Sequence, residues 1–157
     1  FDNLKYFEQI KKNYDKIEYK YIKEYFLKSK YSDNLILYIS LTDDNFKDTY
    51  KIFKIDFSKE IVKFSKTKKI NFLNKTKKYL HLTCRLDSFL ETVYNKNPWE
   101  DLLIGFQCKV FRIPNEYNID FWHHFTNIYV TSKNVRTSNK CLKCIRLNQK
   151  IINETLF

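Results

Sequence analysis

Residues 79–113 decide the fold, and they read YLHLTCRLDSFLETVYNKNPWEDLLIGFQCKVFRI. The first eight, residues 79–86, form an apolar, β-branched and aromatic run that predicts a strand. Residues 106–113 (FQCKVFRI) predict another strand, which ends at Pro114. The residues between them show helical spacing. We therefore expect the chain to leave a sheet, form helices and return to the same sheet.

The two helices in this stretch are predicted from the residues at their ends. Asp87 or Ser88 is placed to cap the first helix, and Glu91 follows Ser88 at the spacing of a capping box. Asn97 would cap the second helix, with Pro98 in its first position. Gly105, the only glycine of the chain, would end it.

Three further strands and a long helix are predicted towards the N-terminus. Residues 35–41 (LILYISL) and 50–57 (YKIFKIDF) predict two strands, and residues 61–65 predict a third that completes a meander. From Leu4 to Tyr25 apolar residues recur at steps of three and four, which predicts an amphipathic helix.

The expected fold class is therefore α+β, with a mainly antiparallel five-stranded sheet covered by helices and preceded by a long amphipathic N-terminal helix. The last helix would begin at Asn118 or Asp120 and reach Tyr129. We divide the chain into a helical arm (1–34), an α+β domain (35–130) and a basic tail (131–157). The lysine-rich stretch before residue 79 is expected to be an exposed loop.

The composition excludes a disordered chain but says little about partners. Of 157 residues, 43% are hydrophobic and 18% are aromatic, which is enough to form a core. The net charge is +11, from 29 basic and 18 acidic residues. Only four basic residues are arginine, alanine is absent, and lysine and asparagine abound, as strongly AT-rich coding sequence favours. This compositional bias weakens the usual inference from positive charge to nucleic-acid binding.

The ends of the chain and its hydropathy give two more expectations. Because the sequence lacks Met and begins with Phe1, we expect a fragment of a longer protein. No apolar run approaches the length of about 18 to 20 residues that crosses a bilayer, and no leader with a cleavage site is visible. We expect a cytoplasmic chain without a transmembrane segment.

Two segments resemble a known type of domain. Residues 84–94 (CRLDSFLETVY) and 99–113 (WEDLLIGFQCKVFRI) are similar to the strand, helices and returning strand of the sterol-carrier-protein fold, and the likeness extends over residues 35–129. The string WEDLLIG at 99–105, followed by Arg112-Ile113-Pro114 and Tyr117-Asn118, resembles the C-terminal region behind the metallo-β-lactamase-like domain of Rieske-associated and sugar-nucleotide hydroxylase-like proteins.

This resemblance implies an accessory role. The His/Asp metal site would lie in a preceding part of the protein, and the whole protein would be a metal-dependent hydrolase or oxygenase. The chain itself would not be catalytic. One departure is Asn95-Lys96-Asn97, because other sterol-carrier members have a glycine on each side of the second helix.

A ligand site is expected at the end of the last strand. There, Trp99, Arg112, Tyr117 and Trp122 would line an apolar pocket, or Arg112 would hold an anionic head group. His123 is included in this ligand site, and of His123 and His124 the one that does not face the core could serve as a general base. The simpler alternative is an aromatic core with an arginine that reaches solvent and an ordinary exposed histidine.

The cysteines leave several possibilities open. Cys141 and Cys144 form a C-x-x-C that could bind Zn²⁺, act as a redox pair or be incidental thiols. Cys84 and Cys108 are isolated in predicted strands, where small buried residues are common. With no second ligand pair in the sequence, incidental thiols are the favoured interpretation.

Two functions from different classes follow. The favoured one is an accessory domain that binds a hydrophobic or anionic small ligand or holds an assembly together, with the N-terminal helix packed on the rest of its own polypeptide or on a second copy. The alternative is a basic module associated with nucleic acid or ribonucleoprotein. It would use the lysines and aromatic residues of 63–78 and the basic stretch 133–150.

Overall fold

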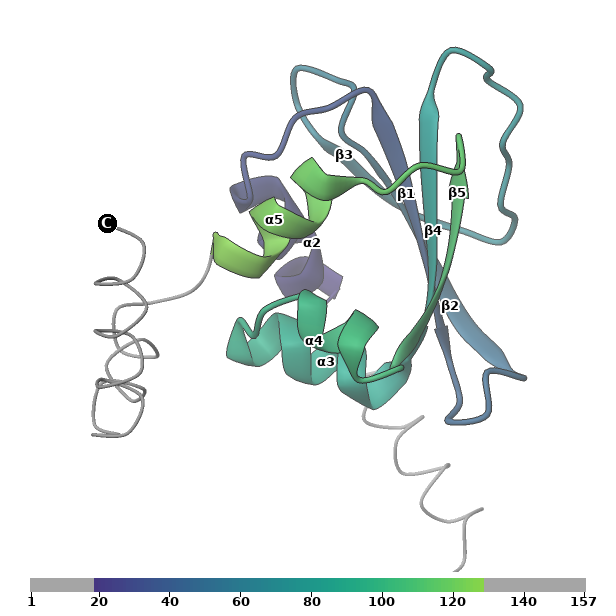
Figure 1. Ribbon diagram of the computed structural model, residues 1–157, viewed down its shortest axis with the longest axis vertical. Coiled ribbons are helices and arrows are strands. Elements are labelled where there is room, and N and C mark those ends of the chain that lie inside the picture. Colours follow the sequence, from purple (N-terminus) through teal and green to yellow (C-terminus); the bar gives the residue numbers. More distant parts are fainter. Residues whose placement is uncertain (1–18, 129–157) are drawn as a thin grey trace, which may run out of the picture.

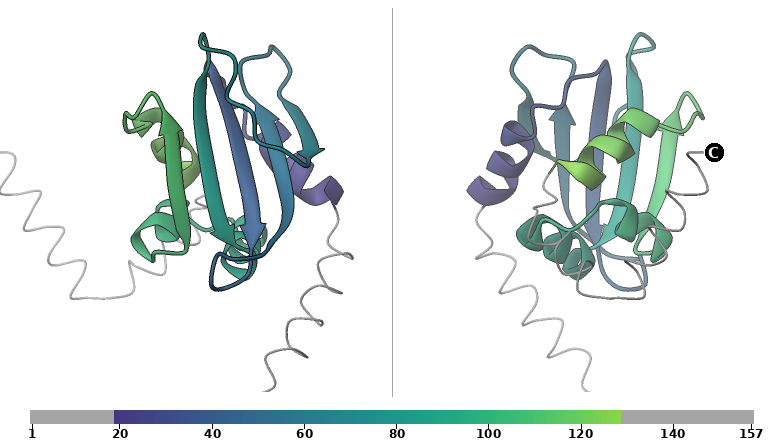
Figure 2. Two further views of the ribbon diagram at one scale, coloured as in Figure 1. Left: turned by 90° about the vertical axis from the view of Figure 1, so that its right-hand side faces the viewer. Right: turned by 60° about the vertical axis from the view of Figure 1, so that its left-hand side comes forward.

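The computed structural model describes residues 19–128, which form four helices and five strands. In chain order these are α2 (Tyr19–Lys28), β1 (Leu35–Thr42), β2 (Thr49–Asp56), β3 (Lys63–Thr67), β4 (Lys78–Arg85), α3 (Leu86–Asn95), α4 (Glu100–Ile104), β5 (Cys108–Ile113) and α5 (Ile119–Asn127). The five strands make one sheet and the helices lie on one side of it (Figures 1 and 2). The predicted α+β class is confirmed.

The order of strands in the sheet is β3-β2-β1-β4-β5. The predicted meander of the first three strands is present, since β1–β2 and β2–β3 are antiparallel, and β4–β5 is antiparallel as well. However, β4 pairs with β1 in parallel, so the sheet is mixed. After β3 the chain crosses to the far side of β1, and this crossover places β1 in the centre of the sheet.

The central position of β1 explains its composition. All eight residues of β1 are buried, because helices cover one face and the β3–β4 connection covers part of the other. Strands that are buried on both faces are uninterrupted apolar runs rather than alternating ones. The sequence LILYISLT fits that description.

The main core lies between the sheet and the helices. It contains both tryptophans and most of the buried phenylalanines, and α2 contributes Ile22, Tyr25 and Phe26 to it. The apolar face of residues 19–28 is thus used within the fold. The remainder of the predicted N-terminal helix and the basic tail lie outside the described residues, and the division into three parts stays a prediction.

The other face of the sheet has a smaller apolar cluster. Ile36, Tyr38 and Tyr79 are buried there, and Ile70 and Phe72 from the β3–β4 connection pack against them. The connection crosses this face in Figure 1. The lysine-rich loop predicted here therefore has exposed lysines and an anchored aromatic side chain.

The segment from α3 to β5 follows the predicted course with shifted ends. Helix α3 begins at Leu86, directly after β4, so Asp87 and Ser88 lie inside it, and Ser88 donates to Gln107 Oε1 at 3.0 Å instead of capping it. Helix α4 ends before Gly105, as predicted. Its N-cap is Trp99 and its first residue is Glu100, so Asn97 does not cap it and Pro98 lies before its first position. A Cβ atom at Gly105 would lie 2.8 Å from the Asp101 carbonyl oxygen, which explains why this position has no side chain.

Candidate functional site

The predicted ligand-binding residues separate into buried and accessible groups. Trp99 and Trp122 are 0% and 1% exposed and belong to the main core. Arg112 and Tyr117 are brought together, with the guanidinium carbon 5.7 Å from the centre of the Tyr117 ring. His123 lies on the exposed side of α5. That any of these residues holds a ligand stays a prediction.

Tyr117 lines a small cavity of about 70 Å³, which we call the turn cavity. Its walls are Tyr31, Asp33, Lys78 at the start of β4, Pro114 and residues 116–121, which include the turn into α5. Liquid water occupies about 30 Å³ per molecule, so this space suits one or two waters or a small cationic group.

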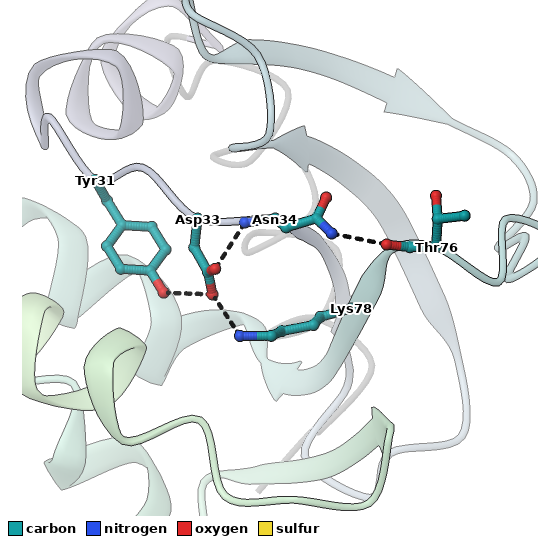
Figure 3. A network of polar contacts seen from close by, with 5 residues as sticks. All are labelled: Tyr31, Asp33, Asn34, Thr76 and Lys78. Carbon is teal, nitrogen blue, oxygen red and sulfur yellow. Dashed lines mark hydrogen bonds and ion pairs between the residues drawn. The ribbon is translucent and has the colours of Figure 1, made fainter.

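A polar network forms one wall of the turn cavity (Figure 3). Asp33 accepts a hydrogen bond from the Tyr31 hydroxyl at 3.4 Å and pairs with the Lys78 ammonium at 3.5 Å. Next to it, the Asn34 side chain donates to the Thr76 carbonyl at 2.7 Å. Together these contacts fasten the segment before β1 to the start of β4.

The electrostatics of the turn cavity disfavour an anion inside it. Asp33, Glu116 and Asp120 line the cavity, and Lys78 is the one basic residue among its lining residues. Burial, and then the charges of Asp33 and Asp120, raise the pKa of the Tyr31 hydroxyl well above its ordinary value.

A second cavity, of about 100 Å³, opens between α2 and the end of α3. Tyr21 and Tyr25 form its apolar wall, and Glu24, Lys28 and Lys96 also line it, with Lys28 paired to Glu24 at 2.9 Å. The Tyr25 hydroxyl accepts a hydrogen bond of 2.6 Å from Trp99 Nε1. Trp99 therefore supports this wall from inside the core.

A basic groove of about 600 Å³ runs along the adjoining ends of β2 and β3. It is lined by residues 49–52 and 66–68, which include Tyr50 and the three lysines Lys51, Lys66 and Lys68. The groove includes part of the lysine-rich stretch that the nucleic-acid alternative uses. It is open to solvent along β3, which is an edge strand.

The structure also brings together two pairs that the sequence did not reveal. Ser40 Oγ and His81 Nε2 are 2.9 Å apart on the outer face of the sheet, and Thr83 Oγ1 is 3.4 Å from the same nitrogen. Burial lowers the pKa of His81. Cys84 lies directly opposite Cys108 in the β4–β5 ladder. Both pairs depend on strand register, for which these short sequences gave no signal.

The predicted zinc ligands Cys141 and Cys144 lie outside the described residues. Within residues 19–128 there is no group of three or more His, Cys, Asp or Glu side chains that could hold a metal ion. In the same range, no helix combines the length and the apolar character needed to traverse a bilayer.

Comparisons with known proteins found similarity to a region of longer curated proteins. No family model matches the chain. It is 32% identical over 111 residues to cytidine monophosphate-N-acetylneuraminic acid hydroxylase of Sus scrofa, a match that covers 67% of this chain and 23% of the relative. The hydroxylase of Macaca mulatta is 30% identical over 128 residues, with 77% and 20% covered. The matched region thus makes up about a fifth of the length of these curated relatives.

Among solved structures, sterol carrier protein 2 from Yarrowia lipolytica in its apo form is similar to this chain. The two chains share 18% identity with a TM-score of 0.40, over 71% of this chain and 79% of the other. The predicted resemblance to sugar-nucleotide hydroxylase-like proteins therefore has a counterpart among the curated relatives, whereas the metallo-β-lactamase-like part stays a prediction.

Proposed function

We propose that this chain is a non-catalytic accessory domain of a longer, hydroxylase-type polypeptide and that it holds that assembly together through the edge of its sheet at β5. The observation that carries the proposal is the match to a region amounting to about a fifth of much longer hydroxylases. A region of that size can add a docking surface to a catalytic part that lies elsewhere in the polypeptide.

The docking surface is an exposed apolar area that we call the β5 face. Nine large hydrophobic residues are well exposed in the described chain, and six of them lie between residues 104 and 119. The six are Ile104, Phe106, Phe111, Ile113, Tyr117 and Ile119. Phe106 is 85% exposed and Ile104 is 70% exposed. These residues follow one another along the chain around β5, and the proposal is that the remaining polypeptide covers them.

The backbone of β5 supports the same assignment. Its only strand neighbour in residues 19–128 is β4, so its outer edge presents free backbone donors and acceptors. Edge strands of this kind pair readily with additional strands unless charges or loops protect them. Lys109 is exposed on β5, yet its ammonium lies 4.7 Å from the centre of the Phe46 ring, which draws it towards β1 and β2 rather than the edge.

A ligand bound at the border of the β5 face could contact both this chain and the rest of the polypeptide. Arg112 lies on β5 with its guanidinium over the Tyr117 ring, and a guanidinium binds carboxylate or phosphate in a bidentate manner. The relatives are named for a sugar nucleotide, which carries both groups. We infer that Arg112 would contact the anionic part of such a substrate while the remaining polypeptide performs the metal-dependent chemistry.

The test requires the neighbouring coding sequence. The remainder of the polypeptide is expressed separately, and its affinity for the 157-residue chain is measured by calorimetry. We expect binding that Phe106→Asp weakens at least about tenfold, because one buried aromatic anchor can supply more than the 1.4 kcal/mol that a factor of ten requires. The matched control is Ile61→Asp, because Ile61 is 76% exposed but lies between β2 and β3.

Two results would contradict the proposal. One is a coding sequence in which residues 1–157 stand alone without a hydroxylase-type part. The other is equal loss of affinity in Phe106→Asp and Ile61→Asp, which would mean that the β5 face has no special role.

The basic groove supports the alternative function, a module that binds nucleic acid. Its three lysines and Tyr50 could contact phosphates and a base. Single-stranded RNA binding is measured at two salt concentrations with the parent chain and with Lys51→Gln/Lys66→Gln/Lys68→Gln. A steep loss of affinity with salt that the triple variant flattens would favour this alternative. A flat salt response in the parent chain would remove it.

A further inference from the structure

We propose that Cys84 and Cys108 form a redox-active pair that closes to a disulfide across β4 and β5, and that this bond fastens the edge strand to the sheet. The proposal rests on strand register, on the position of the two thiols and on the segment that they enclose. It is independent of the accessory function argued above.

The register places the two residues at a site that suits a disulfide. Cys84 and Cys108 are direct partners in the antiparallel β4–β5 ladder. The next pair along the ladder, Arg85 and Gln107, is joined by a backbone hydrogen bond of 3.1 Å. Because hydrogen-bonded and non-hydrogen-bonded pairs alternate, Cys84 and Cys108 form a non-hydrogen-bonded pair. In such pairs the Cα atoms are about 4.5 Å apart, within the range of about 4.4 to 6.8 Å found in disulfides.

Both thiols point to the same face of the sheet. Cys84 belongs to the main core and is fully buried, and Cys108 is half-buried and packs against the same core. Interaction with Cys84 lowers the pKa of Cys108, whereas interaction with Cys108, together with burial, raises the pKa of Cys84. Cys108 is therefore the accessible nucleophile, and Cys84 is the thiol that resolves the reaction.

The oxidant we assign is a small disulfide such as oxidised glutathione. The Cys108 thiolate attacks one sulfur of the oxidant and releases the first thiolate, which leaves a mixed disulfide on Cys108. Cys84 then loses its proton and attacks Cys108 Sγ, and the second glutathione thiolate leaves. Two protein thiols become one disulfide, and one oxidised glutathione becomes two reduced molecules.

The disulfide would close a loop that contains both α3 and α4. These helices leave the sheet after β4 and return to it at β5, so the disulfide would close the loop between two adjacent strands. Oxidation would restrict separation of β5 from β4 at the end of the sheet where the chain enters α3.

The experiment uses the full 157-residue chain carrying Cys141→Ser and Cys144→Ser, so that only Cys84 and Cys108 remain. The folded protein is equilibrated with excess oxidised glutathione, then unfolded in denaturant, alkylated and analysed by mass spectrometry. We expect one chain that has lost two hydrogens, with both cysteines protected from alkylation. Its Tm should rise by about 10 °C relative to the reduced protein, since closing a loop of this size restricts the unfolded chain.

A variant separates the two chemical steps. With Cys84→Ser added, the reaction should stop at a glutathione adduct on Cys108, whereas Cys108→Ser should leave Cys84 unmodified in the folded protein. The proposal is overturned if the parent protein keeps both thiols open to alkylation, or if its glutathione adduct persists without conversion to the disulfide. Both of these outcomes are measured on the parent protein, so they decide the proposal even if a variant fails to fold.

Discussion

Trp99 illustrates how one residue can suggest a binding site in the sequence and serve the core in the structure. It is fully buried, and its ring packs against aromatic residues from three helices, Tyr25, Phe26, Phe89, Phe121 and Phe125. Its indole N–H donates to the Tyr25 hydroxyl at 2.6 Å. A buried tryptophan needs a hydrogen-bond acceptor for its indole N–H, and the positions of aromatic residues in the sequence do not show which residue supplies it.

The hydrogen bond between Trp99 and Tyr25 gives a prediction at the scale of one atom. Tyr25→Phe removes the acceptor and leaves the indole N–H buried without this partner. We expect the free energy of unfolding to fall by about 1 to 3 kcal/mol, measured by urea denaturation. Tyr117→Phe is the matched control, because Tyr117 is 50% exposed, and it should change stability by less than about 0.5 kcal/mol. Equal effects of the two variants would contradict the assigned role.

Among the elements, the strands show what the sequence could and could not predict. Period and composition identified all five strands, because LILYISL and YKIFKIDF differ clearly from the helical spacing around them. The parallel pairing of β1 with β4 was not predicted, since it depends on the crossover after β3. The continuous burial of β1 is the one local sign of its central position.

The candidate site was predicted less completely than the fold, for a related reason. Arg112 and Tyr117 are five residues apart on either side of one turn, so their contact follows from local sequence. Ser40 and His81, and Cys84 and Cys108, are brought together by register between strands that are distant in the chain. A shift of one residue would place these side chains on the opposite face, and no turn residue in the sequence fixes that shift.

The pairing of β1 and β4 gives a prediction of pH dependence. Burial holds the pKa of His81 below its ordinary value of 6.5, so the folded state favours the neutral ring. The resulting stability is fully present above about pH 6.5 and is lost as the pH falls through the folded-state pKa. His81→Gln cannot titrate, so it should lose less stability than the parent chain when the pH falls from about 7.5 to about 5.

The control for this element is Ser40→Ala. It removes the partner at 2.9 Å but keeps the imidazole, so the parent pH dependence of the unfolding free energy should persist. Urea denaturation at both pH values measures all three proteins. The interpretation is wrong if His81→Gln and the parent chain lose the same free energy over this range.

At the scale of the whole molecule, the aromatic core joins α2, the sheet and the remaining helices. Phe26 is fully buried on α2, and its ring lies 5.8 to 6.4 Å, centre to centre, from rings on four other parts of the chain. Those rings belong to Phe57, Phe64, Trp99 and Phe125. Loss of this one side chain therefore affects contacts between segments that are far apart in the sequence.

Phe26→Ala should accordingly destabilise the fold as a unit. We expect a loss of about 3 to 5 kcal/mol in the free energy of unfolding, because the cavity would lie among rings held by several elements and could close only in part. Tryptophan fluorescence reports this core directly, since both tryptophans are buried in it, and far-UV circular dichroism reports the helices and the sheet. The two urea transitions should shift together, whereas Phe106→Ala, at an 85% exposed position, should leave both within about 0.5 kcal/mol of the parent. If the variant instead separates the two transitions, α2 belongs to a unit that unfolds independently of the sheet, because one cooperative core cannot yield two midpoints.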